Sequence, residues 1–169
     1  MRLWQKNTIP TEEIDRFTVG HDRELDVMLA KWDALGSMAH VTMLHSIGLI
    51  DDNELPCLLA ELKNIVREAE EGRFVIEDGI EDVHSQVELT LTRKLGDMGK
   101  KIHAGRSRND QVLLDLKLFA RDGIRRVAEA VKKLSDELLA KSEEYKDVVM
   151  PGYTHLQVAM PSSFGLWFG

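Results

Sequence analysis

Residues 109–145 read NDQVLLDLKLFARDGIRRVAEAVKKLSDELLAKSEEY and contain no proline. Apolar residues recur there at intervals of three and four, which predicts one amphipathic helix about three times the ~11–12-residue average. Such lengths are typical of long bundles, coiled coils or repeats. The chain shows no internal repeat, and its apolar positions are too mixed for a strict heptad coiled coil. We therefore predict a bundle helix with this stripe: Val112, Leu116, Phe119, Ile124, Val127, Val131, Leu134 and Leu138.

Two shorter helices are predicted before this stretch. Residues 21–47 have helical apolar spacing, and Gly48 supplies a left-handed C-terminal cap. Asp51 and Glu54 have the spacing of a capping box, in which each residue's side chain accepts a backbone hydrogen bond from the other. A second helix should therefore follow Asp51 and end at Gly72.

A third helix is predicted from about Glu81 to Leu95, with Val83, Val87 and Leu91 on its buried side, after a short extended link at 74–76. Met150-Pro151-Gly152-Tyr153 should end the long helix, because proline removes a helical donor, and Pro161 with two serines indicates another helix start. The fold class is all-α, with a small N-terminal helical domain (1–108) that includes the loop before residue 109. Residues 109–169 would start a central bundle, and the apolar C-terminal residues suggest that this bundle is truncated.

Composition excludes several classes of protein. The chain has 169 residues and a net charge of −7, which argues against a nucleic-acid binder with a basic surface. A single cysteine, Cys57, cannot form an internal disulfide, so we expect a cytoplasmic protein. We also expect no contact with membranes, because no apolar run is long enough to span one and the first residues lack a signal-peptide pattern.

The basic loop before the long helix is the first candidate site. It reads His103-Ala104-Gly105-Arg106-Ser107-Arg108-Asn109-Asp110-Gln111. A helix N-terminus presents unpaired N–H groups and partial positive charge, which together with Arg106, Ser107, Arg108 and Asn109 suits a carboxylate or phosphate. The alternative is that Ser107 or Asn109 only caps the helix and the arginines are solvated.

A second candidate is the loop Pro151-Gly152-Tyr153-Thr154-His155-Leu156-Gln157. His155 can exchange a proton near neutral pH, although a single loop histidine also fits a structural role. A third is Glu81 with His84, whose spacing occurs in di-metal bundles; the alternative is a helix cap with a His84–Glu88 pair. The other histidines, at 21, 40 and 45, have no evident partner in the sequence.

The two loops, His103–Val112 and Pro151–Gln157, resemble signature stretches of the argininosuccinate lyases, a branch of the fumarase/aspartase superfamily. Residues 81–84 fall where that family has an acidic-histidine stretch. The resemblance covers the whole chain and corresponds to the N-terminal part of the enzyme. It implies a C–N lyase of arginine biosynthesis that reversibly converts argininosuccinate to arginine and fumarate, without metal or organic cofactor.

The resemblance also implies roles for single residues. Ser107, Arg108 and Asn109 would contact the succinate carboxylates beside Arg106, and Thr154 would bind substrate. His155 would act in proton transfer, His84 would line the site, and Gln157 would shape the loop or contact substrate. The family is homotetrameric, and each active site takes residues from three subunits.

The chain departs from the family pattern in several places. The family opening Leu-Trp-Gly-Gly-Arg-Phe is Leu3-Trp4-Gln5-Lys6-Asn7-Thr8, and no serine follows Phe17 where a substrate contact is expected. After Gln157, the common Arg-Ala-Gln-Pro is Val158-Ala159-Met160-Pro161. The superfamily loop Gly-Ser-Ser-x-Met-Pro-x-Lys-x-Asn, with its catalytic serine, is absent from these residues, so we expect the chain alone to be inactive. Alternatives are another superfamily lyase, of the adenylosuccinate lyase or aspartase type, and a non-catalytic structural or oligomerising relative.

Overall fold

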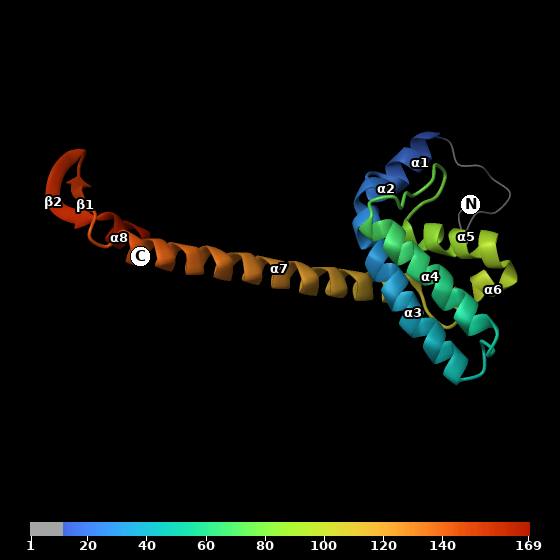
Figure 1. The fold of residues 1–169 in the computed structure, drawn as a ribbon. Helices are drawn as coiled ribbons and strands as arrows, with labels where there is room; N and C mark the ends of the chain where they lie inside the picture. Colours follow the sequence, from blue (N-terminus) through green and yellow to red (C-terminus); the bar gives the residue numbers. More distant parts are fainter. Residues whose placement is uncertain (1–11) are drawn as a thin grey trace. The chain divides into compact units, whose positions relative to one another are not determined.

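The computed structural model describes residues 12–169 and divides them into two compact units, one up to Ala120 and one from Arg121 to Gly169. The family opening at residues 3–8 lies outside the described residues. Helix α7 begins in the first unit and continues into the second (Figure 1). Within the described residues, no helix is both long and apolar enough to cross a membrane.

The first unit contains α1 (Glu12–Val19), α2 (Asp22–Leu25), the 3-10 turn η1 (Asp26–Leu29), α3 (Ala30–Ser46), α4 (Glu54–Glu70), α5 (Val83–Leu95), α6 (Asp97–Lys100), η2 (Lys101–His103) and the start of α7 (Arg108–Glu144).

Helices α3, α4 and α5 enclose the core of the first unit. The core side chains are aliphatic with one phenylalanine, and burying such side chains stabilises a fold by about 1.5–3 kcal/mol each. The apolar stripe predicted for the third helix is confirmed, because its three members are 0–1% exposed. The buried cluster consists of Ala30, Ala34, Val41, Leu44, Ile50, Leu58, Leu62, Ile65, Phe74, Val83, Val87, Leu91 and Ile102.

Local signals place the ends of α3 and α4 as predicted. At the end of α3, Gly48 has a φ of 81° and its N–H donates to His45 O, while Leu49 N–H donates to Leu44 O. This pair of bonds is a Schellman motif, which requires a left-handed residue. Before α4, Asp51 Oδ1 accepts from Glu54 N–H at 2.9 Å and Asp51 N–H donates to Glu54 Oε2 at 3.1 Å, which confirms the capping box.

The prediction of one helix over 21–47 is only partly correct. Helical turns cover this range, but η1 separates α2 from α3. The apolar spacing of this range placed Leu25, Met28, Ala39 and Thr42 on one stripe, and all four are exposed. The buried face of α3 instead contains Ala30, Ala34, Val41 and Leu44, and the 3-10 turn η1, which has a different angular period, separates α3 from α2.

Helix α6 packs closely on the end of α5 through Gly99. A Cβ atom at Gly99 would lie 2.5 Å from the backbone carbon of Leu91 and from the backbone nitrogen of Thr92. These are backbone atoms, so a side chain could be accommodated only by moving α6 away from α5. The glycine therefore sets the spacing of this helix pair.

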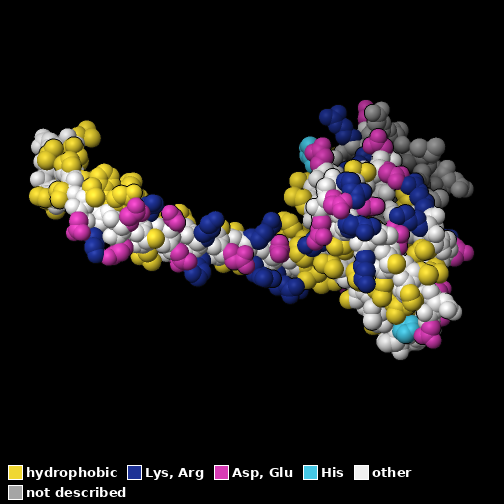
Figure 2. Space-filling model, viewed as in Figure 1, with side chains coloured by type: hydrophobic (Ala, Val, Ile, Leu, Met, Phe, Trp, Pro, Cys, Tyr) yellow, Lys and Arg dark blue, Asp and Glu magenta, His cyan; other side chains and the backbone are white. Residues whose placement is uncertain are grey.

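Helix α7 covers the predicted range with a difference of one residue at each end. Its predicted apolar stripe is not buried within the second unit, where Ile124, Val127, Val131 and Leu134 are 60–70% exposed. Figure 2 shows apolar side chains between the charged ones along this helix. The periodicity therefore predicted the helix correctly, and the part of the stripe in the second unit is exposed to solvent in the described structure.

The second unit also contains a β-hairpin that the sequence reasoning did not predict. Strands β1 (Val149–Thr154) and β2 (Gln157–Ser163) pair antiparallel, with Pro151 opposite Pro161. A two-stranded sheet has only edge strands, which is where proline is tolerated. The helix start expected at Pro161 comes later, at α8 (Phe164–Phe168), where Ser163 Oγ accepts from Leu166 N–H at 3.1 Å. The other regular elements of residues 12–169 are all helical, which agrees with the all-α prediction.

Candidate functional site

The loop before α7 is closed by a hydrogen-bonded box at its helix end. Gly105 has a φ of 71°, a conformation that favours glycine, and it turns the chain towards the helix. The Asp110 carboxylate accepts from Ser107 N–H at 2.8 Å and from the Ser107 hydroxyl at 3.0 Å. These bonds lower the pKa of Asp110, the backbone bond contributing more than the hydroxyl. An internal carboxylate therefore already occupies part of the predicted anion-binding N-terminus, while Asn109 is exposed.

Neither loop arginine is freely solvated, so the part of the alternative that left the arginines solvated is wrong. Arg106 is half-buried and donates from Nη2 to Ser37 Oγ on α3 at 2.8 Å, and its burial lowers its pKa. Arg108 lies 3.0 Å from Asp82 and 3.4 Å from Glu81, and also donates to Ser85 Oγ at 3.4 Å. These contacts tie the loop to α3 on one side and to the start of α5 on the other.

Asp82 connects the acidic stretch to this loop. Its Oδ1 accepts from Ser85 N–H at 2.8 Å and caps α5, as the capping alternative predicted, while its Oδ2 pairs with Arg108. The same alternative paired His84 with Glu88, and that pairing is wrong. His84 points inwards and donates from Nδ1 to Asp33 Oδ1 on α3 at 2.9 Å. Because Glu81 pairs with Arg108 on a different side, the structure does not support a Glu81–His84 metal site.

A buried polar cluster around His84 was missed by the sequence reasoning. Asp33, His84 and Asp115 carry ligand atoms within 4.8 Å of one another, and Gln111 Nε2 donates to Asp33 Oδ1 at 3.1 Å. All four residues are at most 6% exposed. A signal was present: Gln111 and Asp115 are polar, lie four residues apart at the start of α7, and therefore share one face of the helix.

The charges of the cluster shift two pKa values. Burial raises the pKa of Asp115 to about 7, the Asp33 charge adds to this effect, and His84 and Arg106 oppose it. Burial disfavours the charged form of His84, but its hydrogen bond to Asp33 and the surrounding carboxylates outweigh this, so its pKa is raised. Asp115 therefore changes protonation near neutral pH, and His84 keeps its proton to higher pH than a free imidazole.

The Thr154–Gln157 loop forms the tip of the hairpin in the second unit. Thr154 pairs with Gln157 across the strands, and the two residues between them, His155 and Leu156, have φ values of 49° and 62°. Two consecutive positive φ values define a type I′ turn, which is usually formed by Asn-Gly rather than by two larger residues. The turn presents His155 and Leu156 to solvent, and Leu156 is fully exposed.

The histidines at 21, 40 and 45 each have a hydrogen-bond or ion-pair partner in the structure. His40 Nε2 donates to Ala104 O at 2.8 Å, so α3 also holds the start of the basic loop. His45 lies 2.8 Å from Asp52, and His21 lies 3.2 Å from Glu24. Their partners are 3–64 residues away in sequence, and the longest separation could not be found from spacing.

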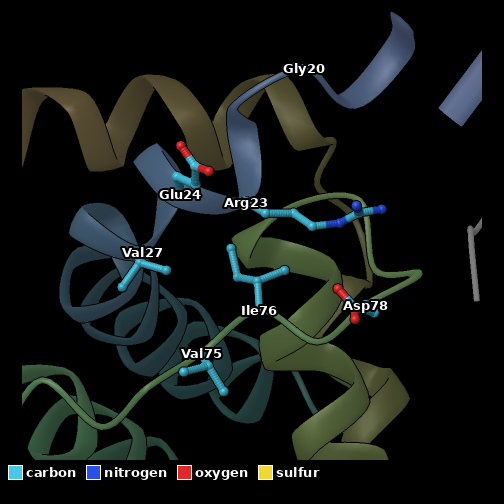
Figure 3. A pocket seen from close by; sticks show the side chains of 7 residues that line it. All are labelled: Gly20, Arg23, Glu24, Val27, Val75, Ile76 and Asp78. Atoms are coloured by element: carbon cyan, nitrogen blue, oxygen red, sulfur yellow. The ribbon is translucent and has the colours of Figure 1, made fainter. Parts of the chain in front are cut away.

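A pocket of about 410 Å³ lies beside α2 in the first unit (Figure 3). Arg23 runs along one side of it towards Asp78, and its Nε donates to Ile80 O at 2.6 Å. The pocket's lining includes none of the predicted site residues; it consists of Gly20, Arg23, Glu24, Val27, Val75, Ile76 and Asp78.

Known proteins similar to this chain are lyases. The chain is 71% identical over 168 residues to the argininosuccinate lyase of Phocaeicola vulgatus and 68% identical to that of Bacteroides fragilis. Both alignments cover 99% of this chain and 38% of the relative, so the chain spans about two fifths of their length. The argininosuccinate lyase of Thiobacillus denitrificans is 41% identical over 155 residues.

Solved structures and a family model agree with these relatives. A variant of EDDS lyase with bound fumarate is 26% identical, with a TM-score of 0.64 over 96% of this chain and 32% of that one. A fumarate lyase:delta crystallin from Brucella melitensis is 17% identical, with a TM-score of 0.69 over 95% of this chain and 42% of that one, and shows the same fold. A family model described as Lyase matches residues 15–169. On this match, which covers nearly the whole chain, the protein belongs to the lyase family.

Proposed function

We propose that this chain is part of an argininosuccinate lyase, which reversibly eliminates arginine from argininosuccinate to give fumarate. The observation that carries the proposal is 71% identity over 168 residues to an enzyme of that name. Residues 1–108 would form the helical domain that carries the basic loop, and residues 109–169 would begin a central bundle. We further propose a cytoplasmic homotetramer that works in arginine biosynthesis without metal or organic cofactor.

The reaction places demands on the protein that the basic loop can meet. A base removes a proton from the carbon beside a carboxylate, that carboxylate takes up the developing negative charge, and the guanidino nitrogen leaves as an acid protonates it. Such a C–H bond is difficult to ionise, so fixed positive groups and N–H donors at the carboxylate contribute strongly. Arg108, Ser107 and Asn109 at the start of α7 are residues of the required kind.

The ion pairs of Arg108 suggest how a substrate would bind at this loop. Its guanidinium is about one third exposed and faces Asp82 and Glu81. A substrate carboxylate would compete with these two carboxylates for the same donors. The charge of Arg108 is thus balanced without substrate, and its side chain is held beside the helix N-terminus rather than free in solvent.

The hairpin tip would supply the proton-transfer group. We assign His155 to that role, Thr154 to substrate binding and Gln157 to shaping the tip, since the three lie together on one tight turn. His84 would line the site through its fixed bond to Asp33, and Arg106 would hold the loop against α3. Where such a loop forms a tight turn, its side chains are presented with little freedom, which suits catalysis.

Ligand titration tests the proposal on the chain itself. We expect fumarate or succinate to release or absorb heat on binding in isothermal titration calorimetry, and Arg108→Ala or Asn109→Ala to weaken that binding at least tenfold, because each removes a carboxylate donor. Arg126→Ala is the matched control, since Arg126 is an exposed arginine on α7 paired only with Asp122 in the described structure.

Fumarate release provides a second test. We expect none from the 169 residues alone, because they lack the superfamily's serine and lysine loop. Turnover by the chain alone, or equal binding by all three variants, would contradict the proposal. Stronger binding of adenylosuccinate or aspartate than of argininosuccinate would favour another lyase of the superfamily, and the absence of any binding would favour a structural relative.

A further inference from the structure

Four polar side chains meet in the core where α3, α5 and α7 come together: Asp33, His84, Gln111 and Asp115. Asp33 Oδ1 accepts from both His84 and Gln111, so one carboxylate oxygen joins all three helices. Gly36, one turn further along α3, permits the close approach of α7. A Cβ atom there would lie 2.8 Å from Leu114 Cδ2 and 3.7 Å from Asp115 Oδ1.

Several buried polar atoms in and beside this cluster have no hydrogen-bond partner in the described structure. Within the described structure, Asp33 Oδ2, Gln111 Oε1 and Asp115 Oδ2 are buried acceptors without a donor, and Arg106 Nε is a buried donor without an acceptor. Leaving such groups buried and unpaired destabilises the fold. A proton on one of the carboxylates would convert an unpaired acceptor into a donor.

The charges around Asp115 come from several elements. Asp33 faces it from α3, His84 from α5, Asp26 from η1 and Arg106 from the basic loop. His84 Nδ1 lies 3.7 Å from Asp115 Oδ2, and Asp82 adds a further negative charge near His84. Two carboxylates this close in the core resist simultaneous ionisation, so one of them retains a proton to higher pH.

The ligand spacing of Asp33, His84 and Asp115 would also suit a metal ion. However, two positive groups, the His84 imidazolium and the Arg106 guanidinium, already face the two carboxylates. With both carboxylates ionised, the charges of these four groups sum to zero, and an added dication would be repelled by Arg106. The charge balance therefore disfavours a metal ion in this cluster.

From this geometry we infer that Asp115 is a positioning residue, whose gain or loss of a proton is transmitted through Arg106 to the loop His103–Asn109. Arg106 is the link because it belongs to the loop, is bonded to Ser37, and faces both buried carboxylates. When Asp115 is ionised, Arg106 is attracted by a second negative charge. When Asp115 is protonated, that attraction is lost and the loop is held mainly through Ser37 and Arg108.

Side-chain NMR on the whole chain tests this inference. We expect the Arg106 Nε–H signal and the Ser107–Asp110 amide signals to shift with pH with a midpoint near 7, together with the Asp115 carboxyl carbon, because burial raises the pKa of Asp115 to about 7. Asp115→Asn should abolish the Arg106 shift or move its midpoint by at least one pH unit. Asp122→Asn, on the exposed part of the same helix, should leave it unchanged.

Unfolding by urea gives a second measurement. An acid with a raised folded pKa keeps its proton between pH 3.8 and about 7 while the unfolded chain releases it, so stability falls as pH rises through this window. We expect the urea midpoint of the unmodified chain to fall from pH 5 to pH 8, and that of Asp115→Asn to fall less. His84, whose pKa is also raised, contributes in the same direction in both proteins.

Three results would overturn the inference. They are an Arg106 signal that does not respond to pH, an unchanged midpoint in Asp115→Asn, and a rise in melting temperature on adding Mg²⁺ or Zn²⁺ that EDTA reverses. The consequence for substrate binding at the loop rests on the proposed function. The NMR titration does not use substrate, so a failed fumarate titration with a normal Arg106 shift would reject only the proposed function.

Discussion

Helices α5 and α7 have the same kind of apolar periodicity, but the apolar stripe of α5 is buried and that of α7 in the second unit is exposed. In α5 the stripe of Val83, Val87 and Leu91 is 0–1% exposed, whereas in the second unit Val131 and Leu134 of α7 are about 60% exposed. Helix α5 packs against α3, α4 and α6, and the second part of α7 has no comparable partner in the described structure. Periodicity thus determines which face of a helix is apolar, and burial of that face depends on other elements.

The largest expected effect tests burial directly. Leu91→Ala should lower the free energy of unfolding of the first unit by about 2–5 kcal/mol, because it removes a fully buried side chain and leaves a cavity. Leu134→Ala, the same substitution on the exposed stripe, should change it by less than ~0.5 kcal/mol. Urea denaturation followed by circular dichroism measures both, and equal losses would mean that Leu134 is buried in solution.

Two glycines extend the comparison of packed and unpacked helices to the backbone, because one lies at a close helix contact and the other does not. Gly99→Ala should destabilise the α5–α6 pair by about 1–3 kcal/mol, since its Cβ would meet backbone atoms at 2.5 Å. Gly123→Ala lies in α7 with no atom within 4 Å of the new Cβ, and should stabilise that helix by about 0.4–1 kcal/mol. Thermal unfolding and amide exchange of α7 report these changes, and a stabilising Gly99→Ala would show that the helices are not in close contact.

The smallest effect on stability is expected for a substitution in the exposed stripe of α7. Such a substitution should mainly change the association between copies of the chain. We expect the chain to self-associate through α7, because large bare apolar surfaces are uncommon in monomers. Val131→Lys should change the unfolding free energy by less than ~0.5 kcal/mol and reduce the associated fraction in sedimentation velocity. Glu129→Gln changes the net charge by the same amount elsewhere on the helix and should leave association intact. A monomeric unmodified chain at micromolar concentration would refute the expectation.

Much of the fold could be predicted because its signals are local. The capping pair of Asp51 and Glu54, the left-handed Gly48 and the proline-free run before Tyr145 each depend on neighbours within a few residues. The hairpin escaped prediction because Pro151 and Gly152 were interpreted only as helix breakers. Its register depends on pairing with a segment about ten residues later.

The candidate site likewise contains motifs that could be found from the sequence and contacts that could not. The basic loop, the acidic stretch and the Thr154–Gln157 turn were found because the residues of each motif are contiguous, and their proposed roles are still predictions. The hydrogen-bond partner of Arg106 lies 69 residues away, those of Arg108 lie 23–27 residues away and those of His84 lie 31–51 residues away, and no spacing rule indicates them.

By itself, the sequence determined the end of α3, the start of α4, the extent of α7 and where charged and polar motifs occur, because these properties follow from local hydrogen bonding and side-chain periodicity. Only the tertiary structure decided that Asp33, His84 and Asp115 share one buried site and that both loop arginines are paired inside the chain. The physical reason is that burial and charge proximity depend on distances between helices. Those distances are set by packing of the core and by close contacts such as those at Gly36 and Gly99.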